Sequence, residues 1–304
     1  MYYLVYGLLY LISLLPMPIL YLFSDGVYAF LYYVIGYRKK VVMDNLAMAF
    51  PKKTDAERKR IAKDFYRNFV DNFIETLKFI SAGKEFMLKR FIVDNPELYE
   101  KIYNEGRKCQ LHLGHNFNWE LANVAMPFLT RFTFIVVYMP LGSKIFDRFF
   151  MSLRTRTGSV MLPATEMSKS MVPYRSTQYM LALVADQSPG SPSNAYWLDF
   201  FGYPTPFVRG PERGARAGDI PVLFAYLYKK KRGYYRGKLE LGSDNPGQLP
   251  EGELTRRYVD FLERNIREQP SLWLWSHRRW KHEWKEEYRN LWMDNKPPAK
   301  MVDR

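Results

Sequence analysis

The sequence predicts an α/β protein with a mostly parallel sheet flanked by helices and an N-terminal hydrophobic membrane segment. Three observations carry this prediction. The first 37 residues are apolar and almost uncharged, short β-branched and aromatic segments recur through the middle of the chain, and helical patterns separate those segments. Strands that alternate with helices are typical of a parallel sheet covered by helices.

Size and charge narrow the class of protein. The chain has 304 residues, of which 47% are hydrophobic and 25% charged, enough to bury a substantial core in one catalytic domain with a terminal appendage. With 45 Lys and Arg against 31 Asp and Glu, the formal charge is +14, which indicates acidic partners: nucleic acid, anionic lipid or an acidic carrier protein. The single cysteine, Cys109, excludes an intrachain disulfide framework and a Cys-rich metal site.

The N-terminus is predicted to attach the chain to a membrane. Residues 1–24 carry no charged side chain, and beyond Asp25 the uncharged run continues to a basic triplet at 38–40. About 20 apolar residues can span a bilayer, tyrosine rings favour its interfaces, and basic residues flank its cytoplasmic side. We expect residues 1–37 to form a membrane-anchoring segment, by spanning or by shallow insertion, and residues 38–304 to form the catalytic domain.

The first elements of that domain follow in order. An amphipathic helix is predicted to begin at Thr54, because Thr54 and Glu57 make a capping box and apolar residues recur at helical spacing as far as Ile80. Three β-branched, aromatic or alternating segments are predicted strands: residues 108–114, 132–138 and 179–186.

The second half of the chain holds a loop, a hairpin and a helix. Residues 186–214 are rich in Pro and Gly and too long for an ordinary connector, so they are predicted to form a functional loop. Residues 220–241 predict two strands around a basic turn, and residues 254–270 predict a helix. Gly-rich phosphate loops of the nucleotide-binding types are absent from the sequence.

One histidine and one glutamate are candidates for catalysis. His115 follows Gly114 at the predicted end of a strand, and Glu120 lies in the first turn of the next helix. Parallel sheets place their sites at this end of the strands. A carboxylate that holds a histidine ring fixes its tautomer and leaves the other nitrogen free as a base, without any metal. The same spacing also fits a structural histidine that caps a helix, and His112, on the other face of its strand, is predicted to be structural.

The element "HNFNWE" at 115–120, which contains both candidate residues, is similar to a His-Phe-Gly-Asn-Trp-Glu element of one protein family. That family is the bacterial lipid A late acyltransferases, the lauroyl and myristoyl transferases of lipopolysaccharide synthesis. Further segments match the family's motifs in the same order: "NLAMAFP" at 45–51, the segment at 137–158, "DQSP" at 186–189, "FFGYPTPFVRGPE" at 200–212 and "LWLWSHRRWK" at 272–281. The likeness covers roughly residues 1–285, and it implies a glycerolipid-acyltransferase-like fold.

The resemblance also implies a reaction. His115 would be the general base and Glu120 its orienting partner. His115 would deprotonate a hydroxyl of an acylated glucosamine lipid, and the alkoxide would attack the thioester of an acyl-acyl carrier protein. No cofactor or metal is expected. The implied partners are acyl carrier protein, an anionic glycolipid acceptor and the bacterial inner membrane, with the catalytic domain facing the cytoplasm.

The expected substrate-binding residues are Arg154, Asp186, Arg209, Arg278 and Arg279. Arg154 is a candidate for the charge of a tetrahedral oxyanion or for a substrate phosphate. Asp186 would bind substrate or help to hold the site, and Arg209 is a further candidate of that kind. Arg278 and Arg279 belong to an aromatic and basic segment that we interpret as a lipid-facing or carrier-facing patch and not as a nucleic-acid groove, with His277 as a non-catalytic member.

The sequence departs from the family pattern at two positions and leaves the acceptor open. Phe117 stands where the family usually has Gly, and is expected to place a large ring beside the base. Met139 stands where an Arg often follows the Tyr, which removes a phosphate contact. The same chemistry on another glycolipid or an aminolipid, and a non-enzymatic basic protein that binds membrane or nucleic acid, remain alternatives, as does coenzyme A as the donor carrier.

Overall fold

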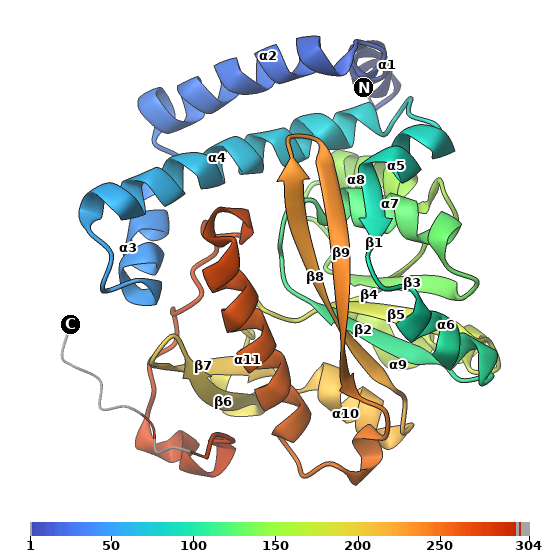
Figure 1. Ribbon diagram of the computed structural model, residues 1–304, viewed down its shortest axis with the longest axis vertical. Coiled ribbons are helices and arrows are strands. Elements are labelled where there is room, and N and C mark those ends of the chain that lie inside the picture. Colours follow the sequence, from blue (N-terminus) through green and yellow to red (C-terminus); the bar gives the residue numbers. More distant parts are fainter. Residues whose placement is uncertain (1, 296–297, 299–304) are drawn as a thin grey trace.

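The computed structural model describes residues 2–295 and 298 and has a seven-stranded sheet at its centre, in the order β1-β9-β8-β2-β5-β3-β4 (Figure 1). Its strands are β1 (Phe91–Val93), β2 (Cys109–Leu113), β3 (Thr133–Tyr138), β4 (Val160–Pro163), β5 (Tyr179–Val184), β8 (Val222–Lys231) and β9 (Tyr234–Ser243). All neighbouring pairs are parallel except β8 and β9, which form the antiparallel hairpin predicted at 220–241. The predicted α/β fold class is confirmed.

Helices cover both sides of the sheet. The α-helices are α1 (Tyr2–Ser13), α2 (Met17–Ala29), α3 (Lys39–Ala49), α4 (Asp55–Lys78), α5 (Lys84–Arg90), α6 (Glu97–Asn104), α7 (Trp119–Leu129), α8 (Lys144–Thr155), α9 (Met167–Ser170), α10 (Gly210–Ala217) and α11 (Glu253–Glu268). Shorter or wider turns are the π-helix η1 (Phe30–Ile35) and the 3₁₀ segments Ala164–Glu166, Val172–Tyr174, Pro192–Asn194, Pro246–Gln248, Pro270–Leu272 and Glu286–Leu291. The predicted capping box of α4 is present, with both hydrogen bonds between Thr54 and Glu57.

Side chains of the central strands alternate between two faces. On β2, Leu111 and Leu113 pack into an apolar cluster with residues of α5, α6 and α7, and we call this side the α7 face. Gln110 and His112 point to the opposite side, where Gln110 lies beside Gly214 of α10 and His112 packs on Tyr258 of α11. We call that side the α10 face.

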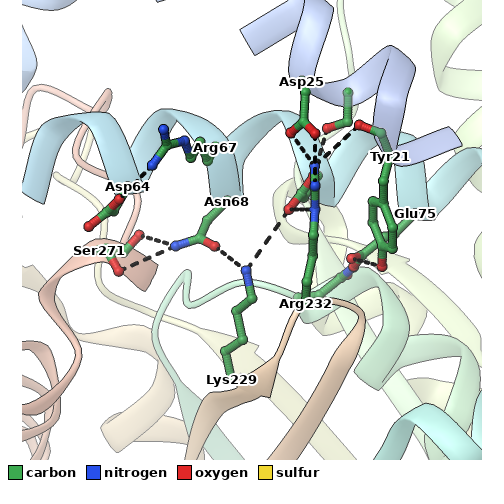
Figure 2. Close-up of polar contacts among 12 residues, drawn as sticks. Tyr21, Asp25, Asp64, Arg67, Asn68, Glu75, Lys229, Arg232 and Ser271 are labelled. Carbon is green, nitrogen blue, oxygen red and sulfur yellow. Dashed lines mark hydrogen bonds and ion pairs between the residues drawn. The ribbon is translucent and has the colours of Figure 1, made fainter. Parts of the chain in front are cut away.

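The N-terminal helices lie across one end of the sheet. Figure 1 shows α2 running along α4 at the top of the molecule, and residues 17–35 form one helix that is long and apolar enough to cross a membrane by length and composition. Its outer side exposes large apolar side chains such as Leu22, Phe23 and Val27. Its inner side buries Leu20 and Tyr28 and also makes polar contacts: the Ser24 hydroxyl donates to Asp71 of α4 over 2.6 Å, and Arg232 of the β8–β9 turn donates to Asp25 over 2.7 Å (Figure 2 shows Arg232 and Asp25).

This contact fixes the direction of the sheet. Because Lys229 and Arg232, at the end of β8 and in the turn after it, contact α4 and α2, the carboxyl end of β8 faces the N-terminal helices. β2 is parallel to β8, and β5 is parallel to β2. The carboxyl ends of all three strands therefore face α4 and α2.

The prediction of one long loop at 186–214 is wrong for most of its length. Residues Ala195–Phe200 and Tyr203–Val208 form β6 and β7, an antiparallel pair outside the main sheet, and α10 begins at Gly210. Phe201 and Gly202 make the turn with φ values of 57° and 84°. Two prolines in β7 suggested a loop because proline cannot donate in a ladder, yet a strand with only one neighbour tolerates it.

Candidate active site

His115 lies just beyond the carboxyl end of β2 and is held there by Asp186. The ring Nδ1 is 2.5 Å from Asp186 Oδ1, and the backbone N–H of His115 donates to Asp186 Oδ2 over 2.8 Å. Gly114 permits this approach, since a Cβ on it would lie 2.6 Å from Leu262 Cδ1 and 3.2 Å from Asp186 Oδ2. A glycine before the histidine is thus a packing requirement.

Asp186 reaches His115 because β5 ends beside β2. Leu113 pairs with Val184 in the parallel register, so the residues that follow both strands meet at one end of the sheet. The Trp273 indole N–H also donates to Asp186 Oδ2 over 2.6 Å. Burial raises the pKa of the Asp186 carboxyl, but the charge and hydrogen bonds of His115 and the bond from Trp273 outweigh it and leave the pKa below its ordinary value. The carboxyl is therefore ionised at neutral pH.

The other ring nitrogen of His115 is directed to a cavity. An ionised carboxylate only accepts, so Nδ1 carries the proton and Nε2 is left as an acceptor. The Gln187 side-chain amide lies 3.2 Å from Nε2, and His115 lines the cavity with its side chain 20% exposed. The arrangement is that of a general base whose tautomer is fixed from behind.

The carboxylate that orients His115 is Asp186 and not Glu120, which corrects the expectation from sequence. Glu120 is buried on α7 and accepts two hydrogen bonds from Arg154 of α8, one of them 2.9 Å from Nε to Oε2. No hydrogen bond joins His115 and Glu120, both of which the structure describes. The sequence places His115 at the end of a strand and Glu120 in the first turn of the next helix, as the structure has them, but the Glu120 side chain is bonded to Arg154 of α8 and not to His115.

Arg154 remains in the site with Glu120. Both residues line the same cavity as His115. Burial lowers the pKa of the Arg154 guanidinium, but the hydrogen bonds and charge of Glu120 outweigh that effect and raise it. A bidentate arginine–carboxylate pair holds the guanidinium in one orientation, so an oriented ion pair stands on the cavity wall.

The predicted binding residues Arg209 and Arg278 lie in different surroundings. Arg209 pairs with Glu251 at 2.5 Å, stacks on Tyr196, and is not among the residues that line the cavity. Arg278 is exposed, and its binding role stays a prediction.

The expectation that Arg279 faces a substrate is wrong. It is 0% exposed, lies 4.2 Å from the ring centre of Phe207, and donates to the Pro206 carbonyl over 2.9 Å. Burial lowers the pKa of its guanidinium to about 10, and the nearby charge of Asp186 opposes that shift. Arg279 is thus a buried cation behind Asp186, and the pattern of alternating Trp and Arg gave no signal for this burial.

Two other histidines are structural. His112, which the sequence predicts to be structural, is buried and forms a hydrogen bond with Gln110 over 2.9 Å. Burial lowers the pKa of its ring to about 3. His277 has a pKa lowered to about 4, mainly by burial and then by the charge of Arg279. Its Nε2 accepts from the Ser188 backbone N–H over 3.0 Å, which fixes the segment after Asp186. The sequence gave no indication of this clamp.

The cavity at His115 has a volume of about 1490 Å³ and is lined by residues from both faces of the sheet. On the α7 face its lining includes Glu120 and Arg154 and an apolar region formed by Leu111, Leu113, Ala122, Met126 and Phe134. On the α10 face the lining includes Gln110, Ser168, Arg175 and glycines of α10. His115 and Gln187 line it at the carboxyl ends of the strands, between these two regions.

Phe117 does not project beside the base. Its ring is 0% exposed and packs against Phe65 and Phe69 of α4 and against Trp119. It belongs to the core beneath the site and is not among the cavity-lining residues, whereas Met139 lines the cavity. Phe117 therefore joins the site to α4 and leaves the cavity open.

Comparison with known proteins adds a family relationship. Across residues 2–295 and 298, no group of three or more His, Cys, Asp or Glu side chains is placed to hold a metal ion. A family model described as bacterial lipid A biosynthesis acyltransferase matches residues 1–282, which include every residue of the site described above. No curated protein matches the chain.

Proposed function

Because the chain belongs to the bacterial lipid A biosynthesis acyltransferase family, we propose that it moves a fatty acyl chain from an acyl carrier protein thioester to a hydroxyl of a lipid A precursor. The observation that carries the mechanism is the His115–Asp186 pair, with His115 Nε2 directed to a cavity large enough for a lipid chain. The orienting carboxylate in this proposal is Asp186.

The reaction begins with proton transfer to His115. As the acceptor hydroxyl loses its proton to Nε2, its oxygen attacks the thioester carbonyl carbon, and Asp186 stabilises the imidazolium through Nδ1. Collapse of the tetrahedral intermediate breaks the carbon–sulfur bond. The thiolate leaves with the proton from Nε2, so the histidine is neutral again and the new ester bond is complete.

Arg154 supplies positive charge to this reaction. The Glu120 carboxylate holds its guanidinium on the cavity wall, where it faces the developing oxyanion or a phosphate of the acceptor. A well-placed donor to an oxyanion contributes about 3 to 4 kcal/mol to the lowering of a barrier. Glu120 therefore acts on the reaction through Arg154.

The apolar region on the α7 face takes the acyl chain. Leu111, Leu113 and Phe134 form the sheet side of this region, and Ala122 and Met126 form the helix side. Burial of each methylene of a fatty chain contributes about 0.8 kcal/mol, so an enclosed apolar space selects a long chain over a short one.

The N-terminal helices hold the protein at the bacterial inner membrane, with the catalytic domain on the cytoplasmic side. The apolar outer side of residues 17–35 would contact lipid, while Arg232 and Asp71 hold the inner side to the catalytic domain. The acceptor hydroxyl then reaches His115 from the end of the sheet that faces these helices.

Product analysis tests the function. Purified full-length protein is incubated with acyl carrier protein charged with a long-chain fatty acid and with a lipid A precursor in detergent, and the lipid is analysed by mass spectrometry. We expect an added mass of one ester-linked acyl group, absent with His115→Ala. Lipid A from a deletion strain should lack the same group. Unchanged lipid A, or acylation of only another glycolipid or an aminolipid, would contradict the proposed acceptor.

A further inference from the structure

The part of the cavity on the α10 face forms a groove along β2 and β5. Gln110 of β2 and Leu181 and Leu183 of β5 form its floor. Met167, Ser168 and Met171 stand along one side, and Gly210, Gly214 and Gly218 of the α10 segment stand along the other. The three glycines are exposed, and a Cβ on Gly210 would meet no atom within 4 Å, so the wall leaves room for a ligand at Gly210. A Cβ on Gly214 would lie 3.3 Å from Gln110 Nε2, so the absence of a side chain there brings this wall close to the floor.

The groove joins the catalytic end of the sheet to a cationic end. Gln187 and Ser188 line it beside His115, whereas Lys108 and Arg175 line it at the start of β2 and before β5. The Lys108 ammonium donates to the Arg175 carbonyl over 2.5 Å and lies 5.6 Å from the ring centre of Tyr179, so the two cationic residues are neighbours. Neither side chain forms an ion pair with another residue of the described chain.

The two ends of the groove face different surroundings. The catalytic end points toward α4 and α2, and α2 exposes large apolar side chains on its outer side. Figure 1 shows α9 and α10 at the end of the molecule away from α1 and α2. A lipid acceptor would reach His115 from the first end, and the second end lies away from the apolar surface of the N-terminal helices.

The length of the groove matches one particular ligand group. β2 has five residues, and at about 3.3 Å per residue it spans about 17 Å. A phosphopantetheine arm has about as many main-chain bonds between phosphorus and sulfur as four to five residues of peptide, which extend over about 15 Å. It has amide groups along its length, a phosphodiester at one end and the thioester sulfur at the other, so its polarity follows the order of groups in the groove.

We propose that this groove holds the phosphopantetheine arm of the acyl carrier protein, with Lys108 and Arg175 beside its phosphodiester and the thioester at His115. The acyl chain then continues around the strand ends into the α7-face region. Lys108 and Arg175 also meet the acidic surface of the carrier where the arm is attached. The inference rests on the proposed function, because it takes a carrier thioester as the donor.

Direct binding separates this inference from catalysis. Fluorescence anisotropy with labelled carrier protein compares the holo form, which has the arm, with the apo form, which lacks it. We expect the holo form to bind wild-type enzyme about tenfold more tightly or better, a difference of about 1.4 kcal/mol. Ser168→Trp, which places an indole in the groove, should remove that preference. Arg175→Glu should weaken binding of the holo form, and the loss should shrink as salt rises.

Controls decide the remaining outcomes. Lys59→Glu changes an exposed cation of α4 by the same two charges and should leave binding unchanged. In activity assays Ser168→Trp should lower kcat/KM for the acyl carrier thioester but not for an acyl N-acetylcysteamine thioester, which has no arm. Equal affinities of holo and apo carrier, or equal losses on both thioesters, would overturn the assignment of the groove.

Free coenzyme A tests which source of the arm is bound. It carries the same phosphopantetheine group without the acidic protein. We expect it to displace the holo carrier much more weakly than unlabelled holo carrier does, and displacement as strong as that by the carrier would overturn the carrier as occupant. An enzyme that binds the holo form selectively yet transfers no acyl group would refute the proposed function and leave the groove assignment standing.

Discussion

Two wholly buried aspartates organise this molecule in different ways. Asp71 of α4 accepts hydrogen bonds from Arg232 over 2.6 and 2.9 Å and from Ser24 over 2.6 Å, and Asp71 and Arg232 line a pocket of about 910 Å³ (Figure 2 shows Arg232). Asp186 is equally buried, and its partner His115 also lines a cavity, with the Gln187 amide 3.2 Å from its Nε2. Burial of a charged pair beside a cavity does not by itself make a reactive site, because a general base needs an atom that can take up a proton at neutral pH.

The cations also differ in kind. Arg232 keeps its charge at every physiological pH, so the Asp71 cluster holds α2, α4 and the β8–β9 turn together without responding to the reaction. His115 gains and loses a proton within each catalytic cycle, and Asp186 is the fixed charge against which it does so. Removing parts of each cluster should therefore affect different measurements.

The largest expected effect comes from the pair of His115 and Asp186. His115→Ala removes the base, and we expect kcat/KM for acyl transfer to fall by about 10³-fold or more. The melting temperature should fall by no more than a few degrees, because buried Asp186 keeps the hydrogen bonds from the residue-115 backbone N–H and the Trp273 indole. Turnover near the wild-type value in a folded His115→Ala protein would refute the mechanism.

The next effect distinguishes the two carboxylates near the base. Asp186→Asn keeps the shape but loses the charge and the preference for one histidine tautomer, and a loss of roughly 10²- to 10⁴-fold in kcat is expected. Glu120→Gln should cost less, about tenfold, since its effect passes through Arg154. Steady-state kinetics of both variants test this order. A lower kcat for Glu120→Gln than for Asp186→Asn would assign the orienting role to Glu120.

This pair of residues shows how far the sequence could lead. His115 was found because a histidine after an apolar segment and a glycine sits where parallel strands place their sites, and the structure puts it there. Asp186 was found as the end of another strand, but its partner was not, since contact between residues 71 positions apart depends on β5 lying beside β2. Strand order comes from packing of the whole chain, and no local pattern contains it.

The burial of Arg279 and Phe117 behind the site could not be predicted from the sequence either. Arg279 looks in the sequence like its neighbour Arg278, yet one is fully buried and the other exposed. The C-terminal segment has no repeating period from which an inner side could be read. Phe117 was expected at the cavity for the same reason, because its packing partners on α4 lie some 50 residues earlier in the chain.

A smaller effect is expected from the Asp71 cluster, which contains Asp71, Arg232 and Ser24. Arg232→Gln leaves Asp71 with weaker hydrogen-bond partners, and we expect the free energy of unfolding to fall by about 2 kcal/mol. The loss should be smaller than for a wholly buried ion pair, because a third of the Arg232 side chain is exposed. In detergent, kcat should change less than twofold. Chemical denaturation and kinetics on one preparation measure both, and a large fall in kcat without a loss of stability would contradict the separation of the clusters.

The smallest effect tests one hydrogen-bonded path from α2 to the start of α7. Tyr21 of α2 donates to the buried Glu75 over 2.9 Å, and Glu75 in turn accepts from Asn118, the cap of α7, over 2.8 Å (Figure 2 shows Tyr21 and Glu75). Tyr21→Phe removes one hydrogen bond, worth about 1 kcal/mol, so the melting temperature should fall by a few degrees. Tyr10→Phe, on the exposed side of α1, is the matched control and should change nothing. If the path is structural only, kcat stays unchanged, because Asn118 keeps its bond to Glu75 and α7 keeps its position. A tenfold fall in kcat at constant stability would instead mean that the N-terminal helices control the active site through Glu75.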